Sequence, residues 1–423
     1  MKRKILLGTI FSILFLGLFL TACKPEPFPI KVNQPGVLDD NQTTADGVTA
    51  VVDANNQFAT EYYARIIKNE DGNVFFSPYS ISSALAMAYE GAKGQTAEEM
   101  QKVFHFPEDA AVRRPAIARI YNLLNSGGKN FKLSTANALW AQKDYPFVDD
   151  YFNTISTYYG GLATNLDFKG ETERSRITIN NWIEDKTYDR IKDLIPSGML
   201  SPATRLVLTN AIYFKANWSH KFDAENTRDG EFKLTSGANR NVKMMHLTSR
   251  FNYGETNDLQ TLEMDYLSNN LSMLIILPKE NNLNRIESIF SKQELNDWKE
   301  GMQNKQVIVT LPKFTFGTKY FMSEDLQAMG MPTAFKYPEA DFTGMSPTGE
   351  LYIDEVIHQT FIEVAEYGTE AAAATAVIMR AGAMAPTEEP KQFTADHPFI
   401  FLIQDKRTGE ILFLGRVMDP TVK

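Results

Sequence analysis

The segment "VAEYGTEAAAATAVIMRAGAMAP" (Val364–Pro386) combines signals that seldom occur together. Four consecutive alanines favour a helix, whereas the β-branched residues Thr375, Val377 and Ile378 that follow favour a strand. Arg380 then lies among alanine, glycine and methionine residues, a composition that is open to proteolytic cleavage. The segment fits neither a regular helix, nor a regular strand, nor an ordinary polar loop.

The alternation of a β-strand gives this segment one face without charge. Small uncharged side chains would let such a strand enter between two strands of an existing sheet, because large or charged ones would overpack it or be buried unpaired. Gly368 precedes the strand and permits a turn that other residues resist. An alanine-rich helix is the alternative, and the pattern alone favours neither. The uncharged face consists of Thr369, Ala371, Ala373, Thr375, Val377 and Met379.

Helical patterns concentrate in the first half of the chain and strands in the second half, which predicts an α+β fold. Ser77-Pro78 is typical of a helix start, with an apolar face continuing to Gly91, and 177–191 is a second amphipathic helix. Strands that are apolar on both faces indicate sheets covered on both sides. The predicted strands are 205–214, 271–278, 306–314, 350–366, 397–403 and 410–417.

The N-terminus is typical of an exported lipoprotein. Lys2, Arg3 and Lys4 precede an apolar run, so residues 1–22 are predicted to be a signal peptide. Leu20-Thr21-Ala22-Cys23 resembles a bacterial lipobox, and Cys23 is the sole cysteine, so we expect a lipid on Cys23 and attachment to a bacterial membrane. An uncleaved anchor helix with an incidental cysteine is the alternative.

The rest of the chain is predicted to be one large domain. Residues 23–50 are rich in proline and polar side chains and predict a flexible tether. No second linker and no repeat follows, so a single domain is expected over 51–423.

The charge argues against a nucleic-acid partner. The net charge is −9, and residues 1–22 carry three basic side chains and no acidic one, so their removal would change it to −12. Binding to nucleic acid requires a basic surface instead.

Motifs for catalysis and for metal or cofactor binding are absent from the sequence. The segment "GMSPTG" (344–349) has Thr348 where a G-x-S-x-G motif needs glycine, and there is no H-E-x-x-H motif and no P-loop. The five histidines lack metal-ligand spacing, so we expect no metal, no cofactor and no enzymatic activity. An exported hydrolase with a triad from distant residues stays open as an alternative. The histidines are His105, His220, His246, His358 and His397.

The segment "EYGTEAAAATA" (366–376) resembles the hinge of the serpin family, and "FTADHPFIFLI" (393–403) resembles the signature that follows the serpin reactive loop. Other segments resemble serpin segments in the same order, so the resemblance covers about residues 52–420. These segments are "NVFFSPYSISSALAMAYEGAKGQTAEEM" (73–100), "LTNAIYFKANWSHKF" (208–222), "VIVTLPKFTF" (307–316) and "EDLQAMGMPTAF" (324–335).

The resemblance implies a fold of three β-sheets and eight or nine helices, with an exposed reactive loop over 366–390. It also implies a monomeric suicide inhibitor of serine endopeptidases, with cysteine endopeptidases as further targets. The target cleaves the loop and forms an acyl-enzyme, and the loop then inserts into the central sheet and carries the protease with it. A non-inhibitory serpin that acts as a binding protein is the alternative.

The resemblance assigns residues to three regions. For Ser77 the plainer interpretation is an N-cap, and for His358 it is a core histidine with satisfied hydrogen bonds; the ten residues from His358 to Gly368 fit the family. Thr369 is expected to lie outside the sheet before cleavage. The hinge comprises Glu366, Gly368, Thr369, Glu370, Ala371, Ala373 and Thr375, the shutter Ser77, Ser80, Asn210 and His358, and the breach Trp218, Lys313 and Glu366.

The scissile bond is less well defined. Counting from the hinge glycine places it at Gly382–Ala383, whereas counting back from Pro398 places it near Thr387–Glu388, since this loop is about five residues longer than is usual in the family. Arg380 would suit a trypsin-like target, and methionine or alanine would suit chymotrypsin-, elastase- or subtilisin-like ones. The predicted window comprises Met379, Arg380, Ala381, Gly382, Ala383 and Met384.

Overall fold

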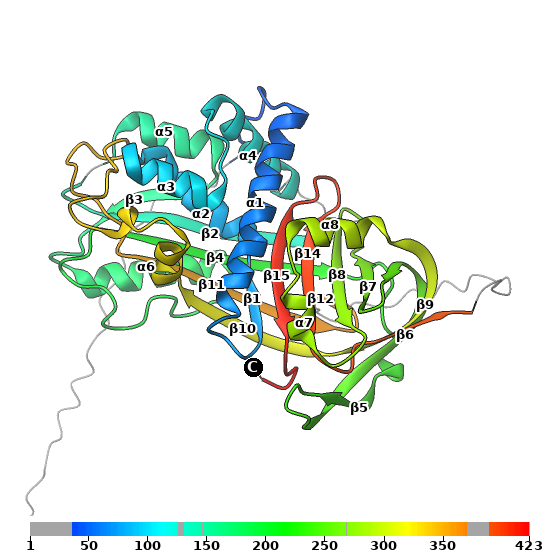
Figure 1. The fold of residues 1–423 in the computed structure, drawn as a ribbon. Helices are drawn as coiled ribbons and strands as arrows, with labels where there is room; N and C mark the ends of the chain where they lie inside the picture. The colour runs from blue at the N-terminus through cyan, green and yellow to red at the C-terminus, as the bar shows by residue number, and fades with distance from the viewer. Residues whose placement is uncertain (1–35, 126–130, 146, 268, 370–388, 423) are drawn as a thin grey trace, which may run out of the picture.

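The computed structural model describes residues 36–125, 131–145, 147–267, 269–369 and 389–422. Within these ranges the chain forms nine α-helices and two hydrogen-bonded β-sheets, so the α+β prediction is confirmed. In Figure 1 most of the helices gather on one side of the molecule and most strands of the larger sheet on the other. The helices are α1 (Ala45–Ile66), α2 (Pro78–Gly91), α3 (Gly94–Phe104), α4 (Ala110–Asn125), α5 (Asp149–Tyr158), α6 (Thr172–Lys186), α7 (Leu283–Glu287), α8 (Lys292–Glu300) and α9 (Ser323–Met329).

The smaller, central sheet has six strands in the order β10-β11-β12-β4-β2-β3. Its middle strands β11 and β4 run parallel, and β2 and β10 flank them in antiparallel pairing. Nearly every side chain of β4 is buried, as its continuous apolar sequence predicts. The strands are β10 (Phe314–Phe321), β11 (Glu355–Ala365), β12 (Gly368–Thr369), β4 (Leu206–Asn217), β2 (Phe131–Gln142) and β3 (Leu162–Leu166).

The larger sheet has nine strands, with β5 attached to one end of β6. The long strand β6 pairs with β9 over Met244–Tyr253 and with β7 over Asn252–Glu255. Because β6 pairs with β5, β7 and β9, the described residues form two hydrogen-bonded sheets where the resemblance implies three. The strands are β1 (Val74–Phe76), β5 (Arg228–Lys233), β6 (Asn239–Glu255), β7 (Leu259–Asp265), β8 (Leu271–Pro278), β9 (Gln303–Pro312), β13 (Lys391–Thr394), β14 (Phe399–Asp405) and β15 (Ile411–Val417).

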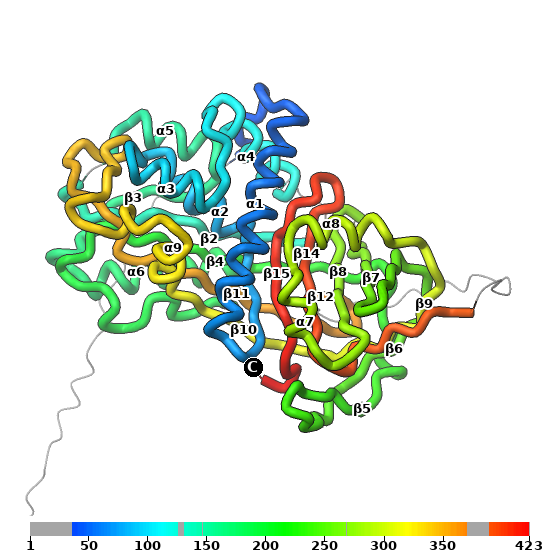
Figure 2. Tube along the Cα trace, viewed as in Figure 1, coloured from blue at the N-terminus to red at the C-terminus, as the bar shows by residue number. Residues whose placement is uncertain are grey.

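Helix α2 is central in the fold and packs against β2, β4 and β15. It begins as predicted, with Ser77 as N-cap and Pro78 in its first turn. Ile81 and Leu85 on this helix are completely buried. Figure 2 shows the N-terminal helix α1 in blue alongside the C-terminal strand β15 in red, and Asn55 Nδ2 donates a hydrogen bond to Ile411 O at 3.1 Å. Both ends of the described chain thus pack around α2.

Several predicted elements have different ends. The helix predicted over 177–191 spans Thr172–Lys186, because Tyr188 and Asp189 adopt positive φ values of 53° and 60° that no helix continues through. The strand predicted over 306–314 divides at Lys313 into β9 and β10. The strand predicted over 350–366 begins only at Glu355.

The prediction of a flexible tether up to residue 50 is wrong in its last part. Thr44 caps α1 by accepting a hydrogen bond from the amide of Gly47 at 3.0 Å, so residues 45–50 are helical. Leu38 is buried, and its amide donates to Asn122 Oδ1 at 2.9 Å. The polar residues around the start of α1 hide it in the sequence, although Val48 already packs against the core. Cys23 and the predicted signal peptide lie outside the described residues. No helix in the described ranges is both long enough and apolar enough to span a membrane.

Candidate functional site

The two central strands of the smaller sheet are closed at one end and parted at the other. Residues 355–360 of β11 pair directly with residues 207–212 of β4. Further along, the two-residue strand β12 lies between them, with Thr369 opposite Val364 on one side and Ala216 on the other. The start of the predicted hinge is therefore already part of the sheet.

Gly368 is required where the chain enters this gap. Its φ is +155°, and a Cβ atom at this position would lie 2.0 Å from Ala216 O. Only glycine tolerates such a close approach of backbone to backbone. The residue therefore has the conformational role predicted from the sequence.

Thr369 contradicts the expectation that it lies outside the sheet. It is 1 % exposed, and its hydroxyl and that of Tyr266 are 2.7 Å apart. The expectation is wrong because Gly368 and Thr369 already form β12, which pairs with both β11 and β4. The other predicted hinge residues Glu370, Ala371, Ala373 and Thr375, and the scissile-bond window Met379–Met384, lie outside the described residues.

The structure brings Ser77, Ser80, Asn210 and His358 together under the closed part of the central sheet, and we call these four residues with Asn137 the α2 polar cluster. Ser77 Oγ donates to Leu412 O at 2.6 Å and accepts from the Ser80 amide at 3.1 Å. Asn210 Nδ2 lies 2.7 Å from Ser80 Oγ and 2.6 Å from Asn137 Oδ1. All five residues are buried, so their polar atoms form hydrogen bonds mainly with protein groups and not with bulk water.

His358 links this cluster to the pairing of β11 and β4. Its Nε2 accepts a hydrogen bond from the Ser77 amide at 3.0 Å, so Nδ1 carries the proton and donates it to Asn210 Oδ1. His358 and Asn210 are also direct partners in the ladder. Burial lowers the pKa of His358 to about 3, which keeps the imidazole neutral.

Asn137 belongs to the same cluster and was missed by sequence reasoning. It lies in β2 between two buried alanines, Ala136 and Ala138, and pairs with Asn210 across the strands. A single amide in an apolar strand carries no signal of its own, because its partners come from distant segments.

Trp218, Lys313 and Glu366 meet at the parted end of the sheet, as predicted. Lys313 Nζ and Glu366 Oε2 form an ion pair at 2.7 Å, and Thr227 Oγ1 donates to Glu366 Oε1 at 2.9 Å. Burial by itself raises the pKa of Glu366, but the hydrogen bonds from Lys313 and Thr227 outweigh it and hold the pKa below its ordinary value. Trp218 Nε1 donates to Ala365 O at 3.0 Å. These contacts fix the chain immediately before Gly368.

Comparison with known proteins agrees with this geometry. A model of the family described as "Serpin (serine protease inhibitor)" matches residues 53–420. The chain belongs to the serpin family. An uncharacterized serpin-like protein of Methanosarcina acetivorans is 42% identical over 417 residues, which cover 97% of each chain. Human leukocyte elastase inhibitor is 38% identical over 380 residues, covering 87% of this chain and 98% of the inhibitor.

A solved structure of human thyroxine-binding globulin with its ligand has the same fold. It superimposes with a TM-score of 0.80 and 30% identity, covering 89% of this chain and all of that one (100%). The chain is thus similar both to a protein named as a protease inhibitor and to one named for binding thyroxine, so membership of the family alone does not decide between these functions.

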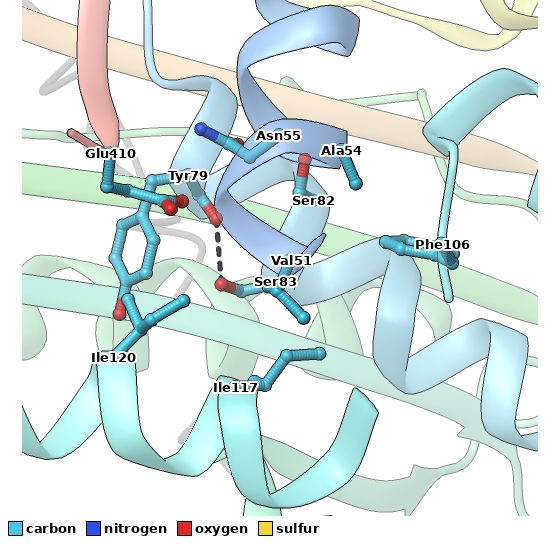
Figure 3. Close-up of a pocket in the computed structure, with 10 residues that line it drawn as sticks. All are labelled: Val51, Ala54, Asn55, Tyr79, Ser82, Ser83, Phe106, Ile117, Ile120 and Glu410. Atoms are coloured by element: carbon cyan, nitrogen blue, oxygen red, sulfur yellow. Dashed lines mark hydrogen bonds between the residues drawn. The ribbon is translucent and has the colours of Figure 1, made fainter. Parts of the chain in front are cut away.

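A small cavity is lined by residues of α1, α2 and α4 and by Glu410. Glu410 lies two residues before Leu412, whose carbonyl accepts the hydrogen bond from Ser77. The volume of the cavity is about 20 Å³, room for about one water molecule. Figure 3 shows Glu410, Asn55 and Ser82 around it, together with apolar side chains from α1 and α4. Glu410 Oε2, Asn55 Oδ1 and Ser82 Oγ have no hydrogen-bond partner within the described part of the protein.

Glu410 is the acidic residue that lines this cavity. It is 2 % exposed, and burial, followed by the nearby charge of Asp405, raises its pKa well above the ordinary value. The folded protein therefore holds Glu410 as a neutral acid at pH values where the unfolded chain ionises it.

No group of three or more histidine, cysteine or acidic side chains suited to a metal ion occurs among the described residues.

We expect Glu410→Gln to stabilise the protein in a pH-dependent way. Near pH 4 the carboxyl is largely protonated in both states, so the variant should unfold at about the same denaturant concentration as wild type. As the pH rises above the ordinary glutamate pKa, the unfolded wild type releases the proton and its folded state does not. Wild type should then lose up to about 1.4 kcal/mol of stability per pH unit relative to the variant, until the pKa of the folded state is reached.

Denaturant unfolding of both proteins from pH 4 to pH 9 measures this difference. Glu108→Gln, at an exposed position, serves as the matched control and should run parallel to wild type. Equal stability of Glu410→Gln and wild type at every pH would show that Glu410 is not held neutral.

Proposed function

We propose that the chain is a trapping inhibitor of serine endopeptidases, with cysteine endopeptidases as further targets. The observation that carries this proposal is β12: the hinge already occupies the gap between β11 and β4, in the arrangement that a growing strand needs. The similarity to human leukocyte elastase inhibitor supports the same activity. In this function the protein is consumed by its target and is not itself a catalyst.

The register of β12 gives the path of the inserting strand. If the strand continues beyond Thr369 in the same register, every second residue turns toward a position where β11 and β4 are completely or almost completely buried. This explains why that face of the segment carries small, uncharged side chains. The neighbours on β11 and β4 would be Ile362 and Phe214 for Ala371, Thr360 and Ile212 for Ala373, and His358 and Asn210 for Thr375.

The chemistry of trapping needs only one peptide bond of the loop. The target's nucleophile attacks a carbonyl in the window Met379–Met384 and forms an ester or thioester, while the amine of the next residue leaves as a new N-terminus. This cut releases the hinge side of the loop from its C-terminal attachment. The freed segment then inserts between β11 and β4 with the acylated protease attached, and distortion of the protease prevents deacylation.

Insertion must separate the direct pairing of residues 355–360 with residues 207–212. The contact between His358 Nδ1 and Asn210 Oδ1 lies in the middle of this segment. The hydroxyl of Thr375 would arrive between these two side chains and offer both a donor and an acceptor. In the proposed function the α2 polar cluster is the shutter, and Trp218, Lys313 and Glu366 form the breach where insertion starts.

A binding protein of the thyroxine-binding globulin type is the second candidate, because a structure of that protein shares this fold. Binding a small ligand does not by itself require a strand to enter the sheet. The seated β12 strand and the small side chains that follow it favour the inhibitor.

We also propose that the protein is exported and anchored by a lipid on Cys23, with the domain acting as a monomer outside the cytoplasm. The charged N-terminal residues, the apolar run and the lipobox-like sequence support this localisation. The chain between Cys23 and the buried residue Leu38 would be the tether.

A panel of endopeptidases tests the proposed function. Trypsin-, chymotrypsin-, elastase- and subtilisin-like enzymes are each mixed with the protein, and complexes that survive denaturing gel electrophoresis are measured against cleaved inhibitor. At least one enzyme should form a covalent complex. Cleavage in the window without any complex would favour the non-inhibitory alternative.

We expect Ala373→Glu to convert the inhibitor into a substrate. In the inserted strand its carboxylate would face Thr360 and Ile212, which are completely buried, at a cost of several kcal/mol. Insertion should slow, so that deacylation yields cleaved inhibitor in place of the complex. Ala372→Glu is the matched control, since it lies on the face that already carries Glu370. An unchanged ratio of complex to cleaved protein in Ala373→Glu would argue against insertion.

Cys23→Ser should release the protein from the membrane fraction. Removing the sulfur removes the lipid acceptor, and the predicted signal peptide alone supplies no lipid anchor. Cells that express the variant or wild type are fractionated, and the protein is followed in each fraction. Equal membrane retention of both proteins would contradict lipid attachment at Cys23.

A further inference from the structure

Tyr266 is a buried tyrosine whose hydroxyl is directed at the hinge. The residue follows β7 and is completely buried. Its hydroxyl and the hydroxyl of Thr369 are 2.7 Å apart, so one donates to the other. Neither hydroxyl has another hydrogen-bond partner in the part of the chain that the structure describes. The two hydroxyls therefore depend on each other.

The ring of Tyr266 is held rigidly by its neighbours. It stacks on Trp218 with 4.5 Å between ring centroids and 9° between ring planes, and it packs edge-on against Phe214 at 5.3 Å. Its backbone also forms a bridge with Trp218. A ring held on two sides places its hydroxyl at one point in space, which is the position that Thr369 occupies when β12 is formed.

We propose that Tyr266 is a positioning residue that holds Thr369 between β11 and β4 and thereby sets the first residue pair of the inserting strand. The proposal rests on the proposed function only where it concerns insertion; its claim about the intact protein stands without a protease. If Thr369 withdrew, both hydroxyls would lose their partner inside the protein, which is costly for a buried group. The hydrogen bond between the two hydroxyls thus favours the conformation in which Thr369 lies between β11 and β4, before any cleavage.

This contact also affects the fate of the acyl-enzyme. Because the first pair of the new strand is already formed, insertion begins by extending a strand and not by nucleating one. If the hinge leaves the gap more often, Thr369 must first pair again with Val364 and Ala216 before the strand can extend. Loss of the hydroxyl should therefore slow insertion and let more acyl-enzyme hydrolyse.

Tyr266→Phe removes the hydroxyl and keeps the ring between Trp218 and Phe214. Thr369→Val removes the partner hydroxyl and keeps a β-branched side chain. In the intact protein we expect hydrogen exchange in peptides covering 366–369 to be about two- to tenfold faster in each single variant, from the usual contribution of one hydrogen bond. The double variant should exchange more slowly than the product of the two single effects, because it leaves no hydroxyl unpaired.

Tyr151→Phe is the matched control. Tyr151 on α5 is also buried, and its hydroxyl donates to Met87 O on α2 at 2.8 Å, far from the hinge in the sequence. Its loss should change hinge exchange little. Unchanged exchange in Tyr266→Phe, or effects of the two single variants that simply multiply, would overturn the proposed contact in the intact protein.

The same variants are then mixed with a protease that wild type traps. We expect Tyr266→Phe to give more cleaved inhibitor relative to complex than wild type and Tyr151→Phe give. Faster hinge exchange with an unchanged ratio would overturn the role in insertion. If wild type itself traps no protease, the proposed function fails, while the exchange data still decide whether Tyr266 holds the hinge.

Discussion

The hydrogen-bonded ladder between β11 and β4 is the interaction on which the rest of the structure depends. It keeps the central sheet closed over residues 355–360, and in the proposed function it must still open for another strand. Parallel pairing is slightly less stable per residue than antiparallel pairing. At the parted end β12 already makes antiparallel pairs with both strands. Extending β12 would exchange one parallel ladder for two antiparallel ones, which gives insertion a favourable direction.

The closed part of this ladder contains buried polar side chains among apolar ones such as Leu208 and Ile357. His358, Asn210 and Thr360 are completely buried, and Thr360 Oγ1 donates to Phe75 O at 2.8 Å. A buried polar group must find a new partner whenever an old one leaves, but it accepts any group with the right donor or acceptor. An apolar interface would lose close packing when the strands part. In the proposed function the α2 polar cluster would thus let the sheet open and close again around a new strand. Outside this ladder, Glu410 Oε2 is a further buried oxygen without a hydrogen-bond partner in the described part of the protein.

The sequence predicts the general plan of this protein better than it predicts the contacts that control it. The α+β class, the start of α2 at Ser77 and the strand Leu271–Pro278 follow from local patterns, because capping and apolar runs are local properties. The resemblance to serpins names residues that do meet, such as Lys313 and Glu366. Asn137, Thr227 and Tyr266 escape prediction, since each is a lone polar group whose partner lies far away in the sequence. Thr369 was misplaced because sequence periodicity shows which face a residue occupies and not when it joins the sheet.

The most direct test of this account compares the thermal unfolding of the intact protein with that of protein cut once in the loop between Arg380 and Met384. A cut normally weakens a fold, because it raises the entropy of the unfolded chain. Here the account predicts a clearly higher unfolding midpoint for the cut protein at the same pH, because the freed segment completes the central sheet. An equal or lower midpoint in the cut protein would contradict it.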